Sequence, residues 1–184
     1  GVLPSIAVVV PSRERRQYLK RLITLRWEKT WAGVHLLTAF HMSKKIARRL
    51  GEAPPAKRAD DLVMSDWIRV LVLEGDFPAD WKGLVRMAGG ADALRRTLRD
   101  LEEARVAADG RDADPILRLY ALYQEKRKAL GLGTTSDPPA AAIARAESSG
   151  LLHSLGPLVY YGLSDMTQLQ TDLLAKVSSV GPVP

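Results

Sequence analysis

Ser5-Ile6-Ala7-Val8-Val9-Val10-Pro11-Ser12 is the stretch that decides the fold of this chain. The apolar, mostly β-branched run over residues 5–10 is typical of a strand buried on both faces, as in parallel sheets. Pro11 ends the run, and Ser12 is a good N-cap for a helix predicted over about 13–28. The apolar side of that helix is expected to consist of Tyr18, Leu19, Leu22, Ile23 and Leu25.

Two further segments repeat the order of strand and helix. Residues 34–38 predict a second strand, followed by a helix over about 42–50 that Gly51 ends. Residues 157–161 predict a third strand, followed by a turn and an amphipathic helix that runs to about Lys176. Buried strands that alternate with helices indicate an α/β fold with a parallel sheet.

The segment between the second and third strands has a different character. Residues 51–149 predict helices at about 60–73, 79–87, 91–107 and 115–130. The first of these is expected to bury Leu62, Val63, Trp67, Val70 and Leu71. We therefore expect an α/β core over residues 1–50 and 150–184, interrupted by a helical insertion over 51–149. A chain of 184 residues is long enough for one such domain with a sizeable insertion.

Positive charge is concentrated in one part of the chain. The net charge is +6, yet residues 11–50 hold eleven basic side chains against Glu14 and Glu28, and the rest of the chain is slightly acidic. The eleven are Arg13, Arg15, Arg16, Lys20, Arg21, Arg26, Lys29, Lys44, Lys45, Arg48 and Arg49. Such asymmetry favours a polyanion as partner, although cations that merely solvate two helix faces would give the same count.

The composition excludes several classes of protein. The sequence has no cysteine, which excludes disulfides, zinc ribbons and cysteine nucleophiles. It has no apolar run of the roughly 18 residues that a membrane helix needs, so we expect a cytoplasmic chain that does not contact a membrane. The three histidines, His35, His41 and His153, lack the spacing of metal ligands, and no metal site is expected.

The segment at 158–170 resembles the Walker B region of UvrD-like superfamily 1 helicases. In that family an Asp-Glu-x-Gln-Asp-Thr-Asn-x-x-Gln pattern follows an apolar strand, and Asp165 and Gln170 stand at matching positions. Tyr161 and Gly162 stand where the family has its magnesium-binding Asp and water-activating Glu. Without those two carboxylates a site can neither hold the metal on the phosphates nor position the attacking water. The resemblance implies a degenerate Walker B segment and no catalytic residue.

Two further motifs extend the resemblance. Residues 11–13 are similar to the turn of these helicases that touches single-stranded DNA, and Thr38-Ala39-Phe40-His41 is similar to their Thr-Phe-His motif, which approaches backbone phosphates. The order of the motifs is most similar to that of the inactivated, helicase-like subunit found in AddAB-type, RecBCD-like, ATP-dependent helicase–nucleases. The resemblance therefore implies an incomplete RecA-like, P-loop-type sheet with an inserted helical subdomain.

The resemblance also implies a DNA-binding site and partners. Ser12, Arg13, Thr38 and His41 would contact phosphates at the carboxyl ends of the strands, where open α/β sheets bind ligands. Arg15, Arg16, Lys44 and Lys45 would add flanking charge. A competing interpretation makes Thr38 a helix cap and His41 a buried, hydrogen-bonded ring. The implied partners are single-stranded DNA and a helicase–nuclease subunit, in a complex that acts as an exonuclease in DNA repair and recombination.

The sequence contains no Gly-x-x-x-x-Gly-Lys-Ser/Thr motif. We therefore expect no cofactor on this chain and assign ATP and Mg²⁺ to the full complex. Two alternatives stay open. The chain could be a fragment of an active P-loop nucleotide-hydrolysing protein whose Walker A motif lies outside it, or a helical module that docks a partner subunit. With the phosphate-loop strand missing, we also expect open sheet edges that associate or are covered.

Overall fold

The computed structural model describes residues 5–26, 33–50, 61–107, 114–134, 136–146 and 155–180. These residues form one three-stranded parallel sheet and a larger number of helices, so the chain is α/β. Among them, no helix has both the length and the hydrophobicity needed to cross a membrane. The elements are β1 (Ile6–Val9), α1 (Arg13–Arg26), β2 (Val34–Leu37), α2 (Ala39–Arg49), α3 (Asp61–Glu74), α4 (Ala79–Arg86), α5 (Gly90–Glu103), α6 (Pro115–Ala129), α7 (Asp137–Arg145), β3 (Leu158–Tyr160) and α9 (Gln168–Val180).

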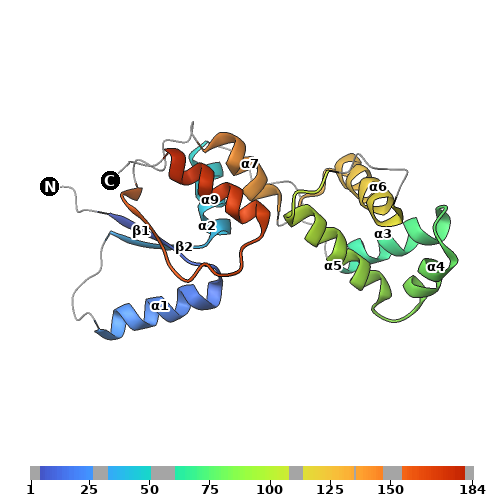
Figure 1. Ribbon diagram of the computed structural model, residues 1–184, viewed down its shortest axis with the longest axis horizontal. Helices are drawn as coiled ribbons and strands as arrows, with labels where there is room; N and C mark the ends of the chain where they lie inside the picture. Colours follow the sequence, from blue (N-terminus) through green and yellow to red (C-terminus); the bar gives the residue numbers. More distant parts are fainter. Residues whose placement is uncertain are drawn as a thin grey trace. The chain divides into compact units, whose positions relative to one another are not determined.

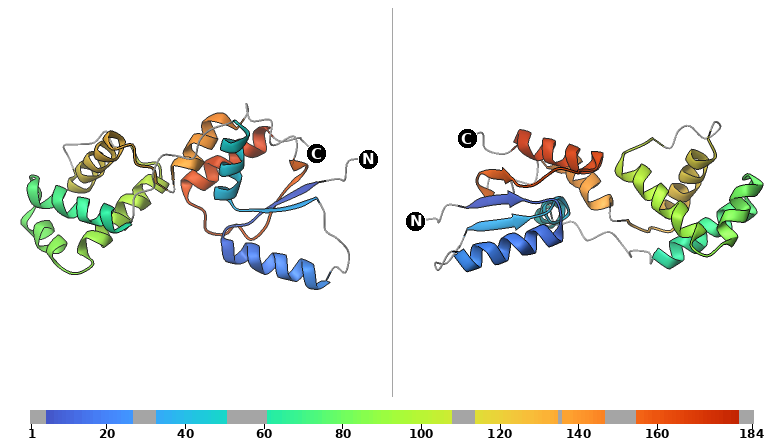
Figure 2. Two further views of the ribbon diagram at one scale, coloured as in Figure 1. Left: turned by 180° about the vertical axis from the view of Figure 1, so that it is seen from behind. Right: turned by 60° about the horizontal axis from the view of Figure 1, so that its bottom comes forward.

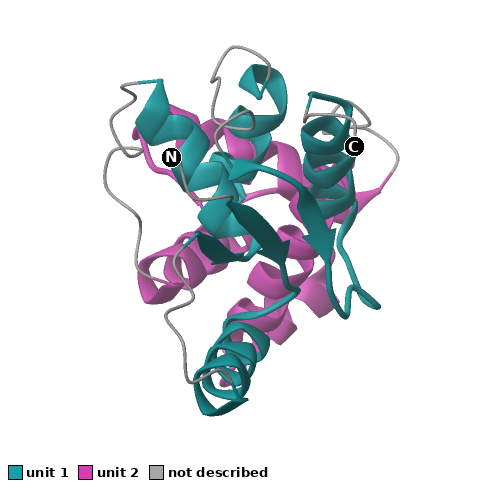
Figure 3. Ribbon diagram, turned by 90° about the vertical axis from the view of Figure 1, so that its left-hand side faces the viewer, with its two compact units in different colours: residues 1–54, 136–184 teal, residues 55–135 magenta. Residues whose placement is uncertain are grey.

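The chain divides into two compact units, which Figure 3 shows in different colours. Unit 1 comprises residues 1–54 and 136–184, and unit 2 comprises residues 55–135. The C-terminal boundary of unit 2 therefore differs from the expected insertion, which ran to residue 149. The reason is α7, which packs against α2 and α9 and so belongs to unit 1.

The sheet of unit 1 has the order β2-β1-β3, with all strands parallel. Ala7 in the central strand lies opposite His35 of β2 and Leu158 of β3. Helix α1 covers one face of the sheet, while α2, α7 and α9 cover the other (Figures 1 and 2). Ala7 and Val9 are fully buried, whereas Ile6 and Val8 on the other face are partly exposed. The predicted strand is therefore confirmed, and its predicted burial on both faces holds only in part.

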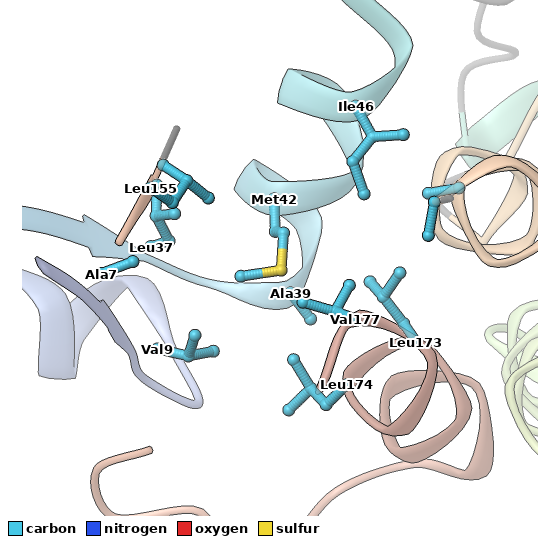
Figure 4. Close-up of a cluster of buried hydrophobic side chains, with 12 residues drawn as sticks. Ala7, Val9, Leu37, Ala39, Met42, Ile46, Leu155, Leu173, Leu174 and Val177 are labelled. Atoms are coloured by element: carbon cyan, nitrogen blue, oxygen red, sulfur yellow. The ribbon is translucent and has the colours of Figure 1, made fainter. Parts of the chain in front are cut away.

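The main core of unit 1 lies between the sheet and α2, α7 and α9. Met42 and Ile46 of α2 are fully buried there, with Leu173 and Val177 of α9 (Figure 4). Helix α1, on the other face of the sheet, buries much less apolar surface, because only Leu19 in it is buried and Leu25 is 83% exposed. The predicted apolar side of α1 is therefore buried only in part.

Gly156 allows the chain to enter β3 beside β1. Its φ is +68°, in the left-handed region, and a Cβ added there would lie 1.9 Å from the carbonyl oxygen of Ser5. Only glycine fits this position without a shift of the backbone. Just after it, the backbone N–H of Ala7 donates to the carbonyl of Pro157 at 3.0 Å and begins the pairing of the two strands.

Unit 2 is a helical bundle with its own core. From α3 it buries Met64, Ile68 and Val72 against α5 and α6. The predicted apolar side of α3 was right only in part. Leu62, Val63 and Val70 are exposed, whereas Trp67 and Leu71 are partly buried and pack against the core. Helix α3 carries apolar side chains on most of its surface, so its periodicity does not decide which side faces the core.

Candidate nucleic-acid interface

A groove of about 500 Å³ lies beside β2 in unit 1. Cations line it from two helices that cover opposite faces of the sheet (Figure 1). Helix α1 supplies Arg16 and Lys20, and α2 supplies Lys44, Lys45 and Arg48. The other described residues of the lining are Val34, His35, Leu36, Leu37, Phe40 and His41, and none of the described lining residues is acidic.

His41 connects the two helices that flank the groove. The Nη1 of Arg16 lies 2.8 Å from Nε2 of His41, and the Oγ1 of Thr38 lies 2.7 Å from Nδ1. A guanidinium can only donate hydrogen bonds, so Nε2 is the acceptor and the ring proton lies on Nδ1. Nδ1–H then donates to Thr38. The geometry thus assigns the tautomer of a neutral His41.

Thr38 holds His41 in position through two hydrogen bonds. The residue is only 8% exposed, and its Oγ1 accepts the backbone N–H of His41 at 3.3 Å as the N-cap of α2. Since the hydroxyl oxygen also accepts Nδ1–H of His41, it fixes both the start of α2 and the orientation of the imidazole. Thr38 therefore takes the role of a helix cap, and it does not line the groove.

The pKa of His41 lies below its usual value near 6.5. Burial of the ring is the largest cause, because it disfavours the charged form. The positive charges of Arg16, Lys44 and Arg13 lower the pKa further. His41 is consequently neutral at pH 7, as its hydrogen bond from Arg16 requires.

The described residues of unit 1 do not neutralise the cations of the groove. Within the described ranges, none of the five Lys and Arg side chains that line it forms an ion pair. The Nζ of Lys44 instead lies 4.6 Å from the ring centroid of Phe40. Unpaired cations that share one groove create a positive potential that attracts polyanions.

The structure brings some of the predicted DNA-binding residues together and leaves others apart. Arg16, His41, Lys44 and Lys45 line the groove, whereas Ser12, Arg13 and Arg15 do not. The Oγ of Ser12 accepts the backbone N–H of Arg15 at 3.3 Å, so this serine acts within the first turn of α1. Arg13 is exposed and acts on the groove through its charge near His41.

Sequence reasoning did not assign Lys20, Arg48 and Phe40 to the site. The basic count of residues 11–50 includes both cations, but only the fold shows that α1 and α2 bring them to the same strand edge. Phe40 belongs to the motif at 38–41, but no role was predicted for its side chain.

The residues predicted to form a degenerate Walker B segment lie elsewhere in unit 1. Tyr161, Gly162, Asp165 and Gln170 follow β3, which is separated from β2 by the central strand. Gly162 has a φ of +65°, Asp165 is exposed, and the backbone N–H of Gln170 donates to Oγ1 of Thr167 at 3.4 Å. In the part of the chain that the structure describes, no three His, Asp or Glu side chains are grouped as metal ligands.

The sequence matches no family model and no curated protein.

Proposed function

We propose that this chain is a non-catalytic, helicase-like part of a cytoplasmic double-strand-break repair complex, in which it grips single-stranded DNA. In this proposal unit 1 is an incomplete RecA-like core that binds the phosphate backbone in its basic groove. Helicase and nuclease activity, together with ATP and Mg²⁺, belong to the full complex with its partner subunit. The proposal joins the motif resemblance at residues 11–13, 38–41 and 158–170 to the chemistry of the groove.

One observation carries the proposal. Five Lys and Arg side chains from α1 and α2 line one groove, and the described part of its lining contains no carboxylate. Contacts to phosphate supply most of the sequence-independent affinity of proteins for nucleic acids, and they depend on unpaired cations. A groove of this kind fits a backbone-gripping role with little preference for sequence.

The test is the salt dependence of binding to a single-stranded oligonucleotide. If about three to five phosphates are contacted, log K falls with log salt with a slope of about −2 to −4. Changing Lys20, Lys44 and Lys45 together to Glu should weaken binding and flatten the slope by about 2. This variant leaves Arg16 in place and so preserves its hydrogen bond to His41.

A matched variant controls for net charge. Arg21, Arg26 and Arg49 lie on the same two helices, are exposed and do not line the groove. Their change to Glu alters the total charge equally and should reduce affinity much less. Equal losses in the two triple variants, or binding that ignores salt, would refute the groove as the DNA site.

A further inference from the structure

The sheet of unit 1 has two open edges, and they differ in charge. In the order β2-β1-β3, β2 and β3 are the outer strands, and neither pairs with a further described strand. The edge of β2 lies in the groove among five Lys and Arg side chains. In contrast, residues 158–163, which form β3 and continue from it, contain no charged residue. Because charged side chains at a sheet edge prevent pairing with another chain, β3 is the edge that remains able to pair.

The backbone of β3 offers hydrogen bonds along this edge. The carbonyl of Pro157 and the N–H of Tyr161 both bond to β1. Since successive residues of a strand bond in opposite directions, the N–H and C=O groups of Leu158 and Tyr160 point away from β1. Within the described part of the chain, no backbone group bonds to them there.

Val159 lies on the face of the sheet that α1 covers only in part. It stands in register with Val8 of β1, which belongs to that face, and α1 packs mainly against β2 at the far side of the sheet. Val159 is consequently 42% exposed. An apolar, β-branched side chain is thus accessible in the middle of the open edge.

On the opposite face, α9 presents small side chains beside the same edge. The hydroxyl groups of Tyr160 and Ser178 hydrogen-bond to each other, which places this side of α9 next to β3. Thr171 and Ala175 lie on the same side of the helix, at i−7 and i−4 or i−3 spacing from Ser178, and all three are exposed. Small side chains let two helices pack closely, so α9 leaves room for a second sheet to approach.

We propose that two copies of this chain pair through β3 and form a twofold-symmetric dimer. In an antiparallel pairing centred on Val159, Leu158 of each copy exchanges backbone hydrogen bonds with Tyr160 of the other, so every outward-pointing group of the edge has a partner. The two Val159 side chains meet at the twofold axis, and the two α9 helices lie side by side. The two three-stranded sheets become one continuous sheet with a basic groove at each outer edge.

Charge and symmetry favour this pairing over the other two that the edges allow. Two β2 edges would bring the cations of two grooves together and repel each other. Pairing of β2 with β3 of the next copy is unsymmetric, and such contacts continue from copy to copy without closing. Of the two described edges, β3 alone is compatible with itself in both charge and hydrogen bonding. Since the basic groove takes no part in this contact, the dimer stands or falls independently of DNA binding.

The first measurement is the mass of the full chain by sedimentation equilibrium. The contact of one short strand and one helix per copy is small and therefore weak, so the concentrations extend to about 1 mM. We expect a reversible change from monomer to dimer that goes no further. A monomer over the whole range would overturn the proposal, and so would a mass that keeps rising beyond the dimer, because it would indicate end-to-end pairing.

An introduced cysteine tests the position of the twofold axis, since the chain has no cysteine of its own. In the proposed dimer the two Val159 residues form a pair of the non-hydrogen-bonded kind, with Cα atoms about 4.5 Å apart, a distance that a disulfide can span. Under mild oxidation, Val159→Cys should become a disulfide-linked dimer at least about 10-fold faster than Leu25→Cys, which is exposed on α1 and lies away from β3. Equal rates of cross-linking would overturn the proposed register.

Two further substitutions of Val159 separate charge from shape. Val159→Glu places two carboxylates opposite each other at the twofold axis and should weaken dimerisation at least about 10-fold. Val159→Thr keeps the β-branched shape without a charge and should still dimerise. A dimer that persists unchanged in Val159→Glu would assign the association to another surface and overturn the proposal. The cysteine cross-link and the mass of the unchanged chain remain decisive if Val159→Glu folds poorly, which circular dichroism would reveal.

Discussion

The two units of this protein differ in whether their positive charges form ion pairs. In unit 2, arginines lie against carboxylates, and the ion pairs involve Arg69, Arg95, Arg96, Arg99, Arg118 and Arg127. In unit 1, the cations of the groove have no such partner among the described residues. The comparison teaches that a count of basic residues does not measure the charge available to a ligand. What matters is whether each cation is already neutralised by its neighbours.

The largest effect is expected where a charge pair is buried. Arg127 and Glu102 of unit 2 lie 3.2 Å apart, with 8% and 12% of their side chains exposed. Removing one member of a buried pair leaves the other charged and desolvated, so Arg127→Ala should cost about 3–5 kcal/mol of stability. Chemical denaturation followed by circular dichroism measures this cost.

Arg96→Ala is the control for that variant. Arg96 pairs with Asp92 at 2.8 Å, but its side chain is 73% exposed. Exposed pairs contribute about 0–1 kcal/mol, so this change should be almost neutral. Similar losses of stability in the two variants would break the distinction between structural and exposed pairs in unit 2.

The second effect is on the pH dependence of DNA binding in unit 1. The pKa of His41 lies below 6.5, so the ring is neutral at pH 7 and gains a proton only as the pH falls further. Protonation adds a charge to the groove and removes the acceptor for Arg16. Affinity for single-stranded DNA should therefore rise about 5-fold or less as the pH falls from about 7.5 to about 5.

His41→Asn should abolish that rise, because its side chain does not titrate. The same lowered pKa has a consequence for stability. The stabilising contribution of neutral His41 is present above the unfolded pKa near 6.5 and is lost as the pH falls through the folded pKa. Affinity that rises equally in His41→Asn would assign the effect to other groups.

The smallest expected effect is a change in the affinity for single-stranded DNA when an arginine of unit 2 loses its ion-pair partner. Asp92 lies 2.8 Å from both Arg95 and Arg96, and the hydrogen bond from Arg95 is the main cause of its lowered pKa. Asp92→Asn should free Arg96, while Arg95 keeps its ion pair with Asp61 at 3.2 Å, and it should raise affinity for single-stranded DNA by about 2-fold at low salt. Fluorescence anisotropy with a labelled oligonucleotide measures the change.

The control for this change is Asp165→Asn, which alters the net charge equally. Asp165 is exposed and accepts a hydrogen bond from the hydroxyl of Ser164 at 3.5 Å, so its replacement frees no arginine. If both substitutions raise affinity equally, total charge rather than local pairing controls binding.

The sheet could be predicted from the sequence because its strands are short runs of mostly apolar residues. Residues 5–10 can form little else than a buried strand, and Ser12 and Thr38 mark where the following helices begin. Helix α7 was not among the helices predicted within residues 51–149, and it begins with two consecutive prolines, Pro138 and Pro139. Both prolines lie in the first turn of the helix, where no backbone N–H is needed.

The groove could be predicted only in part. A charge count identifies the basic segment, and the motif at 38–41 identifies His41 and the helix cap. No local pattern shows that Arg16 and His41, which are 25 residues apart, meet beside β2. That contact depends on α1 and α2 lying on opposite faces of one sheet, which is a property of the tertiary fold.

Unit 1 is built from two segments of the chain that are far apart in sequence, so its strands are synthesised at different times. The ribosome releases β1 and β2 together, but all of unit 2 is synthesised before β3 reaches its place beside β1. The helices of unit 2 make mostly local contacts and can fold during this interval. Until β3 arrives, β1 presents one unpaired edge, which is a template for pairing with a wrong partner. The two-stranded sheet that precedes β3 is therefore the folding intermediate in which a molecular chaperone is most needed to protect the edge of β1.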